Sequence, residues 1–342
     1  MGRAMKLAFV ADPLDSFKIH KDTTFAIMRE AAARGHALYA LEQGDLLLRG
    51  GVVGAQAYRL HLTGEKPRWY RAEDGGTAPL NSYDAVLMRK DPPFDMEYVY
   101  STYLLELAEA QGARVFNRPR AIRDWNEKMG VARFPQFAPP TAVTRREAQV
   151  REFIAEHRDV ILKPLDGMGG ASVFRVREND PNVGVIIETL TEHGERTIMA
   201  QRFIPEIRDG DKRVLLIDGK PVPHALARIP KPGEARGNLA AGATGVAREL
   251  TRRDREIAEA VGPVLRKEGL LLVGLDVIGD WLTEVNVTSP TCFQEITEQT
   301  GFNVAGLFMD ALERELASGR KRARHSPGRR HRVQYCLFAT GT

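Results

Sequence analysis

The segment LLLVGLDVIGDWLTEVNVTSPT, residues 270–291, decides how the rest of the chain is interpreted. Two apolar runs flank a Gly-Asp pair, which is the pattern of a β-hairpin. Asp276 interrupts the first run, and Glu284 and Asn286 interrupt the second. Carboxylates within apolar strands need a partner, and a bound cation is one such partner.

These three polar residues share one face of the hairpin only if its loop has an odd number of residues. Glu284 and Asn286 are two residues apart, so they point to the same side of a strand. A two-residue loop would place Asp276 opposite Thr283, whereas a three-residue loop, 279–281, would place it opposite Glu284. We predict the three-residue loop, which gives three hard oxygen ligands suited to Mg²⁺. The alternative is a hairpin whose polar residues face solvent.

The composition is that of an ordinary globular protein. The 342 residues are 43% hydrophobic and 27% charged, which predicts two or three domains with a large core. No apolar run approaches the roughly 18 residues of a membrane span, and no signal peptide is recognisable, so a membrane partner is not expected. The two cysteines form no disulfide framework, and a reducing cytoplasm is the expected location.

The basic charge is concentrated at the C-terminus. Residues 319–342 contain seven Arg and Lys residues and no acid, and without them the net charge of +4 becomes −3. Nucleic-acid binding is therefore not implied for the folded body, although the tail itself could touch polyanions. The tail has no periodicity, and we expect it to be disordered.

The first third of the chain predicts an open, mainly parallel sheet. A strand at 5–11, a helix at 22–34 and a strand at 38–41 give β-α-β order. Asp22 or Thr23 is the expected N-cap, and Gly35 follows the helix. Further elements are expected as an insertion or hairpin at 49–80, a strand at 85–88, a helix at 96–111 and a strand at 113–116.

The loop 89–95, RKDPPFD, follows a predicted strand of this sheet. Its two prolines exclude a helix and a central strand. Open α/β sheets bind ligands at the carboxyl ends of their strands, so this loop is a candidate ligand contact. A plain surface loop is the alternative. The N-terminal domain is expected to span residues 1–124.

A glycine-rich loop lies in the middle of the chain. After a proline-marked linker at 125–145, a helix at 146–157 and a strand at 159–163, the sequence LKPLDGMGGASVF predicts strand, glycine loop, strand. Glycines let backbone N–H groups approach phosphates, and Lys163 at the strand end needs an anion. The spacing fits neither a Rossmann nor a Walker site, and a simple turn is the alternative.

The remaining elements lead back to the hairpin. We expect a helix at 181–193, strands at 197–204, 214–217 and 220–230, and helices at 251–268 and 302–317. Residues 231–245 are small, glycine-rich and carry Arg236, which predicts a loop that closes over a site, with a plain flexible loop as the alternative. A lysine with a glycine loop, an acidic hairpin face and an arginine-bearing lid together indicate ATP-dependent phosphoryl transfer.

The chain resembles the ATP-grasp superfamily and, within it, the prokaryotic glutathione synthetases. The resemblance covers roughly residues 5–317 and is carried by the motifs LMRKDPPFD (87–95), ILKPLDGMGGAS (161–172), GDKR (210–213), ARIP (227–230), RGNLAAG (236–242) and LTEVNVTSPT (282–291). It implies an α/β ATP-grasp domain at 125–318 behind an N-terminal α/β domain. It also implies a ligase that joins γ-glutamylcysteine and glycine through an acyl phosphate, with two Mg²⁺ or Mn²⁺ ions and a homotetrameric assembly.

The resemblance also implies roles for individual residues. ATP would be bound by Lys128, Lys163, Gly167, Met168, Gly169, Gly170, Gln201, Arg202, Phe203, Ile204, Asp211 and Arg213. The peptide side would involve Arg89, Asn238 and Ser289, with Arg228 and Arg236 as both catalytic and substrate-binding groups. The metal ligands would be Asp276, Glu284 and Asn286.

Two other interpretations remain open at this level. One is a different carboxylate–amine ligase of the same superfamily, such as one that makes a D-alanine dipeptide or adds glutamate to a peptide. The other is a non-catalytic ATP-binding regulatory module, which has no need of Arg228 and Arg236. Cys292 follows the hairpin, but such a cysteine is usually a small, semi-buried side chain without a catalytic role.

Overall fold

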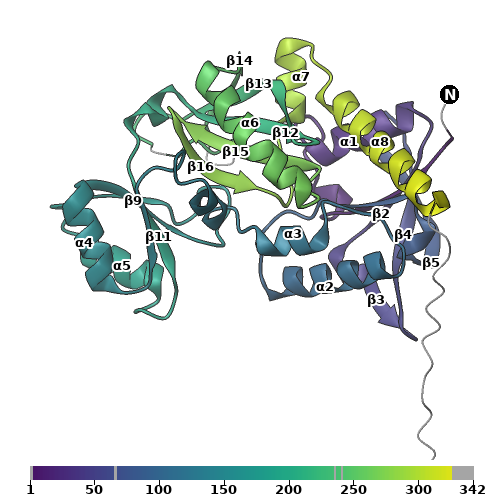
Figure 1. The fold of residues 1–342 in the computed structure, drawn as a ribbon, viewed down its shortest axis with the longest axis horizontal. Helices are drawn as coiled ribbons and strands as arrows, with labels where there is room; N and C mark the ends of the chain where they lie inside the picture. Colours follow the sequence, from purple (N-terminus) through teal and green to yellow (C-terminus); the bar gives the residue numbers. More distant parts are fainter. Residues whose placement is uncertain (1–2, 65–67, 235, 240–241, 326–342) are drawn as a thin grey trace, which may run out of the picture.

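The computed structural model describes residues 3–64, 68–234, 236–239 and 242–325. Within these residues the strands form three sheets, arranged along the long axis of the molecule (Figure 1). The N-terminal sheet lies at one end, and the sheet that carries the hairpin lies in the middle. A smaller sheet backed by two helices lies at the other end.

The N-terminal sheet has a parallel centre, as predicted. Strands β1 (Lys6–Val10), β2 (Ala37–Leu41), β6 (Ala85–Met88) and β7 (Val115–Phe116) pair in parallel in the order β2-β1-β6-β7. Four of the five residues of β1 are buried, as expected for a strand covered on both faces. Helices α1 (Thr23–Ala33) and α2 (Met96–Ala110) supply the cover, and Asp22 caps α1 by accepting from the Phe25 N–H.

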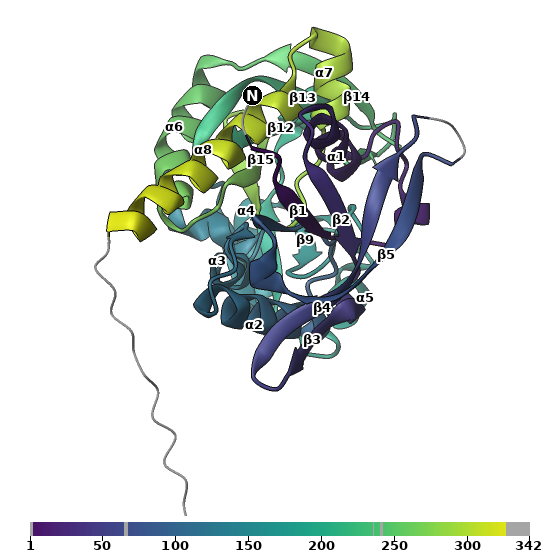
Figure 2. The ribbon, with the colours of Figure 1, turned by 90° about the vertical axis from the view of Figure 1, so that its right-hand side faces the viewer.

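An antiparallel extension makes this sheet less parallel than predicted. Strands β3 (Leu46–Arg49), β4 (Val52–Leu62) and β5 (Tyr70–Pro79) add antiparallel pairs beyond β2. They include the region 49–80 that the sequence predicted as an insertion or hairpin. Figure 2 shows the long ribbon of β4 and β5 at the edge of the molecule.

The small sheet carries the strand that leads into the glycine loop. Its order is β10-β9-β11-β8, built from β8 (Thr141–Thr144), β9 (Asp159–Pro164), β10 (Phe174–Arg177) and β11 (Ile198–Arg202), all antiparallel. Helices α4 (Glu147–His157) and α5 (Val183–Thr191) pack against it through a shared apolar core.

The central sheet presents the hairpin. Its order is β14-β13-β12-β15-β16, from β12 (Asp211–Ile217), β13 (Lys220–Ile229), β14 (Thr244–Glu249), β15 (Leu272–Ile278) and β16 (Trp281–Asn286). Helix α6 (Arg252–Lys267) covers one face and begins with a capping box between Thr251 and Asp254. Strand β14 lies partly within the predicted lid 231–245, so the irregular part of that segment is shorter than expected.

The segment 125–145 is not a free linker. Trp125, Phe134 and Phe137 are buried in the core of the central sheet, and β8 forms within the same segment. Prolines mark irregular backbone, but they do not prevent the apolar residues between them from packing. The sequence also missed the short helix α3 (Pro119–Asp124) just before this segment.

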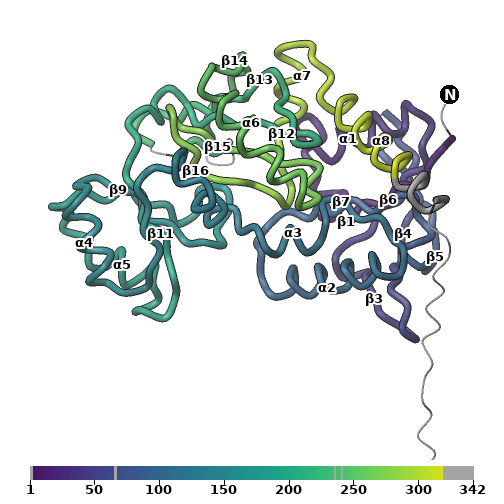
Figure 3. Tube along the Cα trace, viewed as in Figure 1, coloured from purple at the N-terminus to yellow at the C-terminus, as the bar shows by residue number. Residues whose placement is uncertain are grey.

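The last two helices return to the N-terminal sheet. Helix α7 (Phe293–Thr300), which the sequence missed, and α8 (Val304–His325) follow the hairpin, and α8 packs beside α1 (Figure 3). Because α8 runs to His325, it includes the first seven residues of the tail that was expected to be disordered, so that expectation is wrong there. Residues 326–342 lie outside the described residues. Short 3₁₀ helices occur at Leu14–Ser16, Gln43–Asp45, Leu80–Ser82, Met129–Arg133 and Pro205–Asp209.

Asn117 holds the N-terminal sheet to the central sheet. Its Nδ2 donates to the carbonyls of Leu272 and Val287, and its Oδ1 accepts from the N–H groups of Leu271 and Leu272. These bonds fix both ends of the hairpin segment relative to the first domain. Among the described residues, no helix is long and apolar enough to cross a membrane.

Candidate active site around the β15–β16 hairpin

The hairpin brings its polar residues to one face, as predicted, but by a different route. Asp276 pairs with Glu284, and Gly274 pairs with Asn286. Ile278 pairs with Trp281, however, so the loop has two residues and the predicted three-residue loop is wrong. A register shift between Asp276 and Val277 leaves Thr283 as a β-bulge. This extra residue in β16 brings Asp276 opposite Glu284, although the loop has an even number of residues.

The loop itself suits a two-residue hairpin. Gly279, its first residue, has a φ of 55°, and a type II′ turn requires a positive φ at that position. The bulged Thr283 donates its hydroxyl to the Asp276 carbonyl at 3.1 Å, which holds the strand pair together at the shift.

Asp276 is an ionised carboxylate held between two arginines. It is 2% exposed, and Arg213 Nε and Nη2 donate to its two oxygens at 2.5 and 3.0 Å. Arg228 Nη2 lies 3.0 Å from Oδ2. Burial alone would raise the pKa of Asp276, but the two guanidinium groups hold that pKa well below its usual range.

Arg228 also binds Asp211, and this second carboxylate is incompletely satisfied. Arg228 Nη2 donates to Asp211 Oδ2 at 2.5 Å. Asp211 Oδ1 is buried and has no hydrogen-bond donor within the part of the chain that the structure describes. Burial raises the pKa of Asp211 to about 6, against the opposing charge of Arg228. A buried acceptor without a donor is a place for a ligand group.

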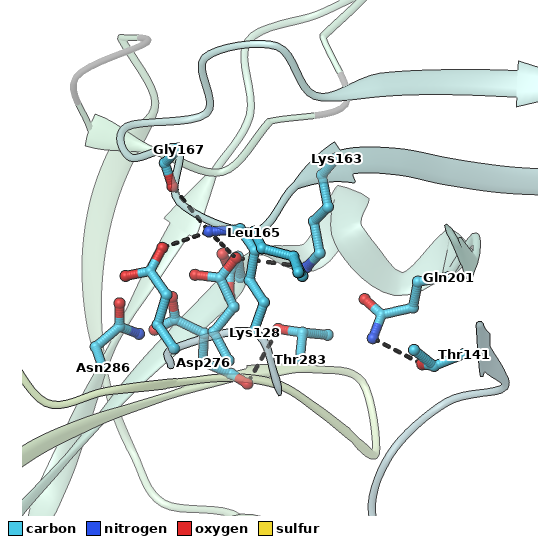
Figure 4. A network of polar contacts seen from close by, with 12 residues as sticks. Lys128, Thr141, Lys163, Leu165, Gly167, Gln201, Asp276, Thr283 and Asn286 are labelled. Carbon is cyan, nitrogen blue, oxygen red and sulfur yellow. Dashed lines mark hydrogen bonds and ion pairs between the residues drawn. The ribbon is translucent and has the colours of Figure 1, made fainter. Parts of the chain in front are cut away.

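Two lysines, Lys128 and Lys163, converge on Glu284. Lys163 Nζ lies 3.4 Å and Lys128 Nζ 3.7 Å from Glu284 Oε1. Lys128 also donates to the Gly167 carbonyl at 2.8 Å and to the carboxylate of Glu127. Figure 4 shows both lysines reaching towards the residues of the hairpin.

This arrangement keeps Lys128 and Glu284 charged. Burial opposes the charge of Lys128, but Glu284 and Glu127 raise its pKa. Burial likewise opposes the charge of Glu284, and Lys128 and Lys163 lower its pKa. Glu127 differs, because burial and the nearby Glu284 raise its pKa. Sequence reasoning missed Glu127, although its position directly before Lys128 was a usable signal.

The oxygen donors of the hairpin fit a hard divalent cation. Asp276 and Glu284 are ionised and adjacent, and Asn286 uses its Nδ2 to donate to the Gly274 carbonyl at 3.2 Å, which leaves its Oδ1 for a ligand. No cluster of three His, Cys, Asp or Glu side chains forms a metal site among the described residues. Two carboxylates and an amide match Mg²⁺, which takes its remaining ligands from water and substrate phosphates.

The glycine loop and the predicted lid touch each other. Gly170 has a φ of 80°, and a side chain there would meet Asn238 Oδ1 at 2.6 Å and Arg236 Cδ at 3.2 Å. Arg236 Nη1 approaches the Gly170 carbonyl at 3.5 Å and its guanidinium also binds Glu234. Glycine at 170 therefore allows the two loops to pack. Residues 235, 240 and 241 of the lid lie outside the described residues.

A cavity beside the two loops gathers half of the residues predicted to bind nucleotide. Its volume is about 90 Å³, and apolar side chains of Ile161, Val173, Ile207 and Ile278 form part of the wall. The predicted residues that line it are Lys163, Gln201, Arg202, Phe203, Ile204, Asp211, Arg236, Asn238 and Glu284. Lys128 and Gly167 lie next to it through their contacts with Glu284 and each other.

Other predicted residues have different settings. Arg213 lies on the neighbouring strand β12, opposite Asp276 and bound to it, and Met168 is 42% exposed in the glycine loop. Gly169 has a φ of 65° in the same loop. Arg89 is 5% exposed and donates to Thr24 Oγ1 at 3.1 Å and to the Pro290 carbonyl at 2.9 Å.

Arg89 therefore ties the end of β6 to the segment after the hairpin. Ser289, in that segment, is hydrogen-bonded to Asp91, whose pKa burial raises. Cys292 is buried, with a φ of 88° at the start of α7, and burial raises the pKa of its thiol. A raised pKa leaves less of the nucleophilic thiolate, so this cysteine is expected to be unreactive.

Two family models match the chain. Residues 5–123 match the prokaryotic glutathione synthetase N-terminal domain, and residues 127–301 match the prokaryotic glutathione synthetase ATP-grasp domain. Together they cover most of the chain.

Curated relatives carry the same name. The chain is 66% identical to a glutathione synthetase of Ralstonia nicotianae over 310 residues, which are 91% of this chain and 96% of the relative. It is 57% identical to one from Neisseria meningitidis serogroup B over 312 residues, 90% of this chain and 98% of the relative.

Solved structures support the fold. A D-cycloserine synthetase has a TM-score of 0.64 at 17% identity, covering 91% of this chain and 99% of that one. A D-alanyl-alanine synthetase A of Vibrio cholerae has a TM-score of 0.55 at 12% identity, covering 93% and 99%. These likenesses bear on the fold alone.

Proposed function

The chain belongs to the prokaryotic glutathione synthetases and is an ATP-dependent ligase that makes glutathione; we propose that it does so through an acyl phosphate formed beside the β15–β16 hairpin. The observation that carries this proposal is the meeting of Lys128 and Lys163 with Glu284, opposite Asp276 and next to the large cavity. Such an arrangement binds and polarises a terminal phosphate.

The proposed reaction has two steps. The cysteinyl carboxylate of γ-glutamylcysteine attacks the γ-phosphorus of ATP, and ADP leaves. The glycine amine then attacks the acyl carbon, a C–N bond forms, phosphate leaves, and the amine loses a proton. No protein side chain forms a covalent bond, so positioning and charge stabilisation carry the catalysis.

The nucleotide would occupy the large cavity. The apolar wall and the backbone of residues 201–204 suit a purine, and the unsatisfied Oδ1 of Asp211 suits a ribose hydroxyl as donor. Lys163 lines the same cavity, and Lys128 joins it at Glu284, so the phosphates would lie there. The glycine loop, with Gly167, Met168, Gly169 and Gly170, would cover them.

A divalent cation would be held by Asp276, Glu284 and Asn286. Two Mg²⁺ ions, or Mn²⁺, would supply charge that offsets the phosphates and polarises the transferred group. The protein's part is to keep both carboxylates ionised, which the flanking arginines and lysines do.

Two arginines would stabilise the acyl phosphate and the oxyanion that forms from it. Arg228 lies at the Asp276 carboxylate, and Arg236 extends from the lid to the glycine loop. Closure of residues 231–245, with Asn238, would exclude water from an intermediate that water destroys. Ser289 would orient the dipeptide, and Arg89 would contribute by fixing the adjacent segment.

We further propose a division into an N-terminal domain at 1–124 and an ATP-grasp domain at 125–318, and a homotetrameric assembly. ATP and a free thiol substrate are reactants of a reducing compartment, which favours the cytoplasm.

The test is release of ADP with Mg²⁺-ATP, γ-glutamylcysteine and glycine, with each omitted in turn. The proposal expects glutathione and ADP in equal amounts only when all three are present. ADP formed without the dipeptide, or no ADP with the complete mixture, contradicts it.

A further inference from the structure

A second, smaller cavity lies between the N-terminal domain and the glycine loop. Its lining comes from the loop after β6, from α3, from the segment 125–127, from the start of the glycine loop and from residues 287–288 after the hairpin. Its volume is about 20 Å³. A single water molecule needs roughly 10–15 Å³ on the same measure, so the cavity accommodates a group of one or two heavy atoms.

The chemistry of the lining favours a small, neutral, mainly apolar group. Six of the ten lining residues are apolar: Pro92, Phe94, Ile122, Trp125, Leu165 and Val287. The charged members are both acidic, Glu127 and Asp166, and among the described residues no Lys or Arg lines this cavity. A substrate carboxylate is therefore disfavoured inside it and belongs outside, on the side of the lysines.

One of the lining residues, Trp125, has an unsatisfied hydrogen-bond donor. Trp125 is 2% exposed, and its Nε1 is buried without an acceptor in the described part of the chain. The indole N–H can only donate, and a buried donor without an acceptor destabilises the protein unless a ligand or water supplies one. An occupant of the cavity that carries an acceptor atom is one way to satisfy this donor.

The cavity is adjacent to the reacting centre. Glu127 lines it and binds Lys128, which also contacts the Gly167 carbonyl and lies 3.7 Å from Glu284. Leu165, another lining residue, is drawn beside these groups in Figure 4. A side chain placed here is thus close to a carboxylate that lies at the phosphate-binding lysines.

We propose that this cavity binds the CH₂–SH side chain of the cysteinyl residue of the acyl donor, with its sulfur accepting the Trp125 Nε1–H. The assignment rests on the proposed function, because it needs a cysteinyl peptide whose carboxylate is phosphorylated at Glu284. The CH₂–SH group matches the volume of the cavity and its mainly apolar lining, and its sulfur is a hydrogen-bond acceptor. Trp125, Ile122 and Phe94 are then specificity determinants for the known reaction.

The first test removes the donor while keeping the ring. Kinetics are measured for wild type and Trp125→Phe with γ-glutamylcysteine and with γ-glutamyl-α-aminobutyrate, in which a methyl group replaces the thiol. We expect wild type to prefer the cysteinyl peptide in kcat/KM by about fivefold or more, and the variant to lose most of that preference. Trp69→Phe, at a buried tryptophan of the N-terminal core, is the matched control and keeps the wild-type ratio.

The second test changes the size of the cavity. Ile122→Ala should raise kcat/KM for γ-glutamylnorvaline relative to γ-glutamylcysteine by about tenfold or more, because one or two methylenes then fit. The KM for ATP and for glycine, and the melting temperature, report on folding in every variant. If both variants keep the wild-type ratios among the three peptides, the assignment is overturned. If wild type releases no ADP with γ-glutamylcysteine, the proposed function itself fails, which is a separate result.

Discussion

Replacement of Glu284 by glutamine separates the electrostatic role of this residue from its role as a metal ligand. The Glu284 carboxylate lies 3.4 Å from Lys163 Nζ and 3.7 Å from Lys128 Nζ, and it faces Asp276 across the hairpin. Glutamine keeps the shape and removes one negative charge. Lys128 then keeps Glu127 and Asp276 as its acidic neighbours, and the metal loses one of its two carboxylates.

The two effects have opposite signs for ATP. Phosphate oxygens bound at the lysines lie within about 5 Å of Glu284, where one pair of like charges costs about 3 kcal/mol at an effective dielectric constant of 20. Partial compensation by the lysines leaves about 1–2 kcal/mol, so metal-free ATP should bind Glu284→Gln about 5- to 30-fold more tightly than wild type. With Mg²⁺ present, kcat should fall by roughly 100-fold or more, because a charge that holds the cation is missing.

Calorimetry with ATP in EDTA and steady-state ADP release with Mg²⁺ measure the two quantities. Glu249→Gln, on the exposed face of β14 in the same sheet, is the control and should change neither. A variant that binds metal-free ATP no better than wild type refutes the electrostatic reasoning. A variant that retains full kcat refutes the metal assignment.

Three further predictions concern other parts of the molecule. Arg236→Ala should lower kcat by about 10- to 100-fold and change the KM for ATP by less than about threefold, because its charge acts on the intermediate rather than on the nucleotide; an unchanged kcat in steady-state assays rejects the lid assignment. In wild type, the KM for ATP should rise as pH falls through the Asp211 pKa of about 6, because protonation removes the acceptor. Asp211→Asn should raise this KM by about five- to tenfold and abolish its pH dependence. A wild-type KM that is flat from pH 5 to 8 contradicts this. Burial raises the pKa of Glu109 to about 7 from an ordinary value of 4.5, so the folded state binds the proton more tightly and stability is lost as pH rises from 4.5 through 7. Glu109→Gln should reduce that loss by about 1 kcal/mol after allowance for solvent screening, as measured by urea unfolding at pH 5 and pH 8 against the exposed Glu152→Gln.

The sequence was most informative for features that residues close together in the chain determine. Alternation around Asp276, Glu284 and Asn286 indicated a shared face, and the pairing of Asp276 with Glu284 confirms it. The Asp22 cap and the following Gly35 placed α1 within a residue. The motifs also identified the family, which excludes the regulatory module and the other ligases that the residues alone left open.

Features that depend on long-range pairing were not accessible in this way. The bulge at Thr283 is selected by how β15 and β16 fit together, and a loop with a different number of residues would have given the same facing pair. Arg213 was expected at the nucleotide because its motif lies there, but its guanidinium is bound to Asp276, 63 residues away in sequence. The aromatic residues of 125–145 pack in the core for the same reason, although the prolines around them indicated a linker.

The charges of the site explain why nucleotide and metal should bind together. Four cations and four carboxylates meet at the hairpin: Lys128, Lys163, Arg213 and Arg228 with Glu127, Asp211, Asp276 and Glu284. The pairs are largely buried, so the balance is needed for stability, and any added ion must bring its own compensation. ATP alone brings excess negative charge towards Glu284, and a divalent cation alone brings positive charge towards the lysines and arginines. Each therefore favours the other, and because such coupling is reciprocal, Mg²⁺ must raise the affinity for ATP by the same factor by which ATP raises the affinity for Mg²⁺.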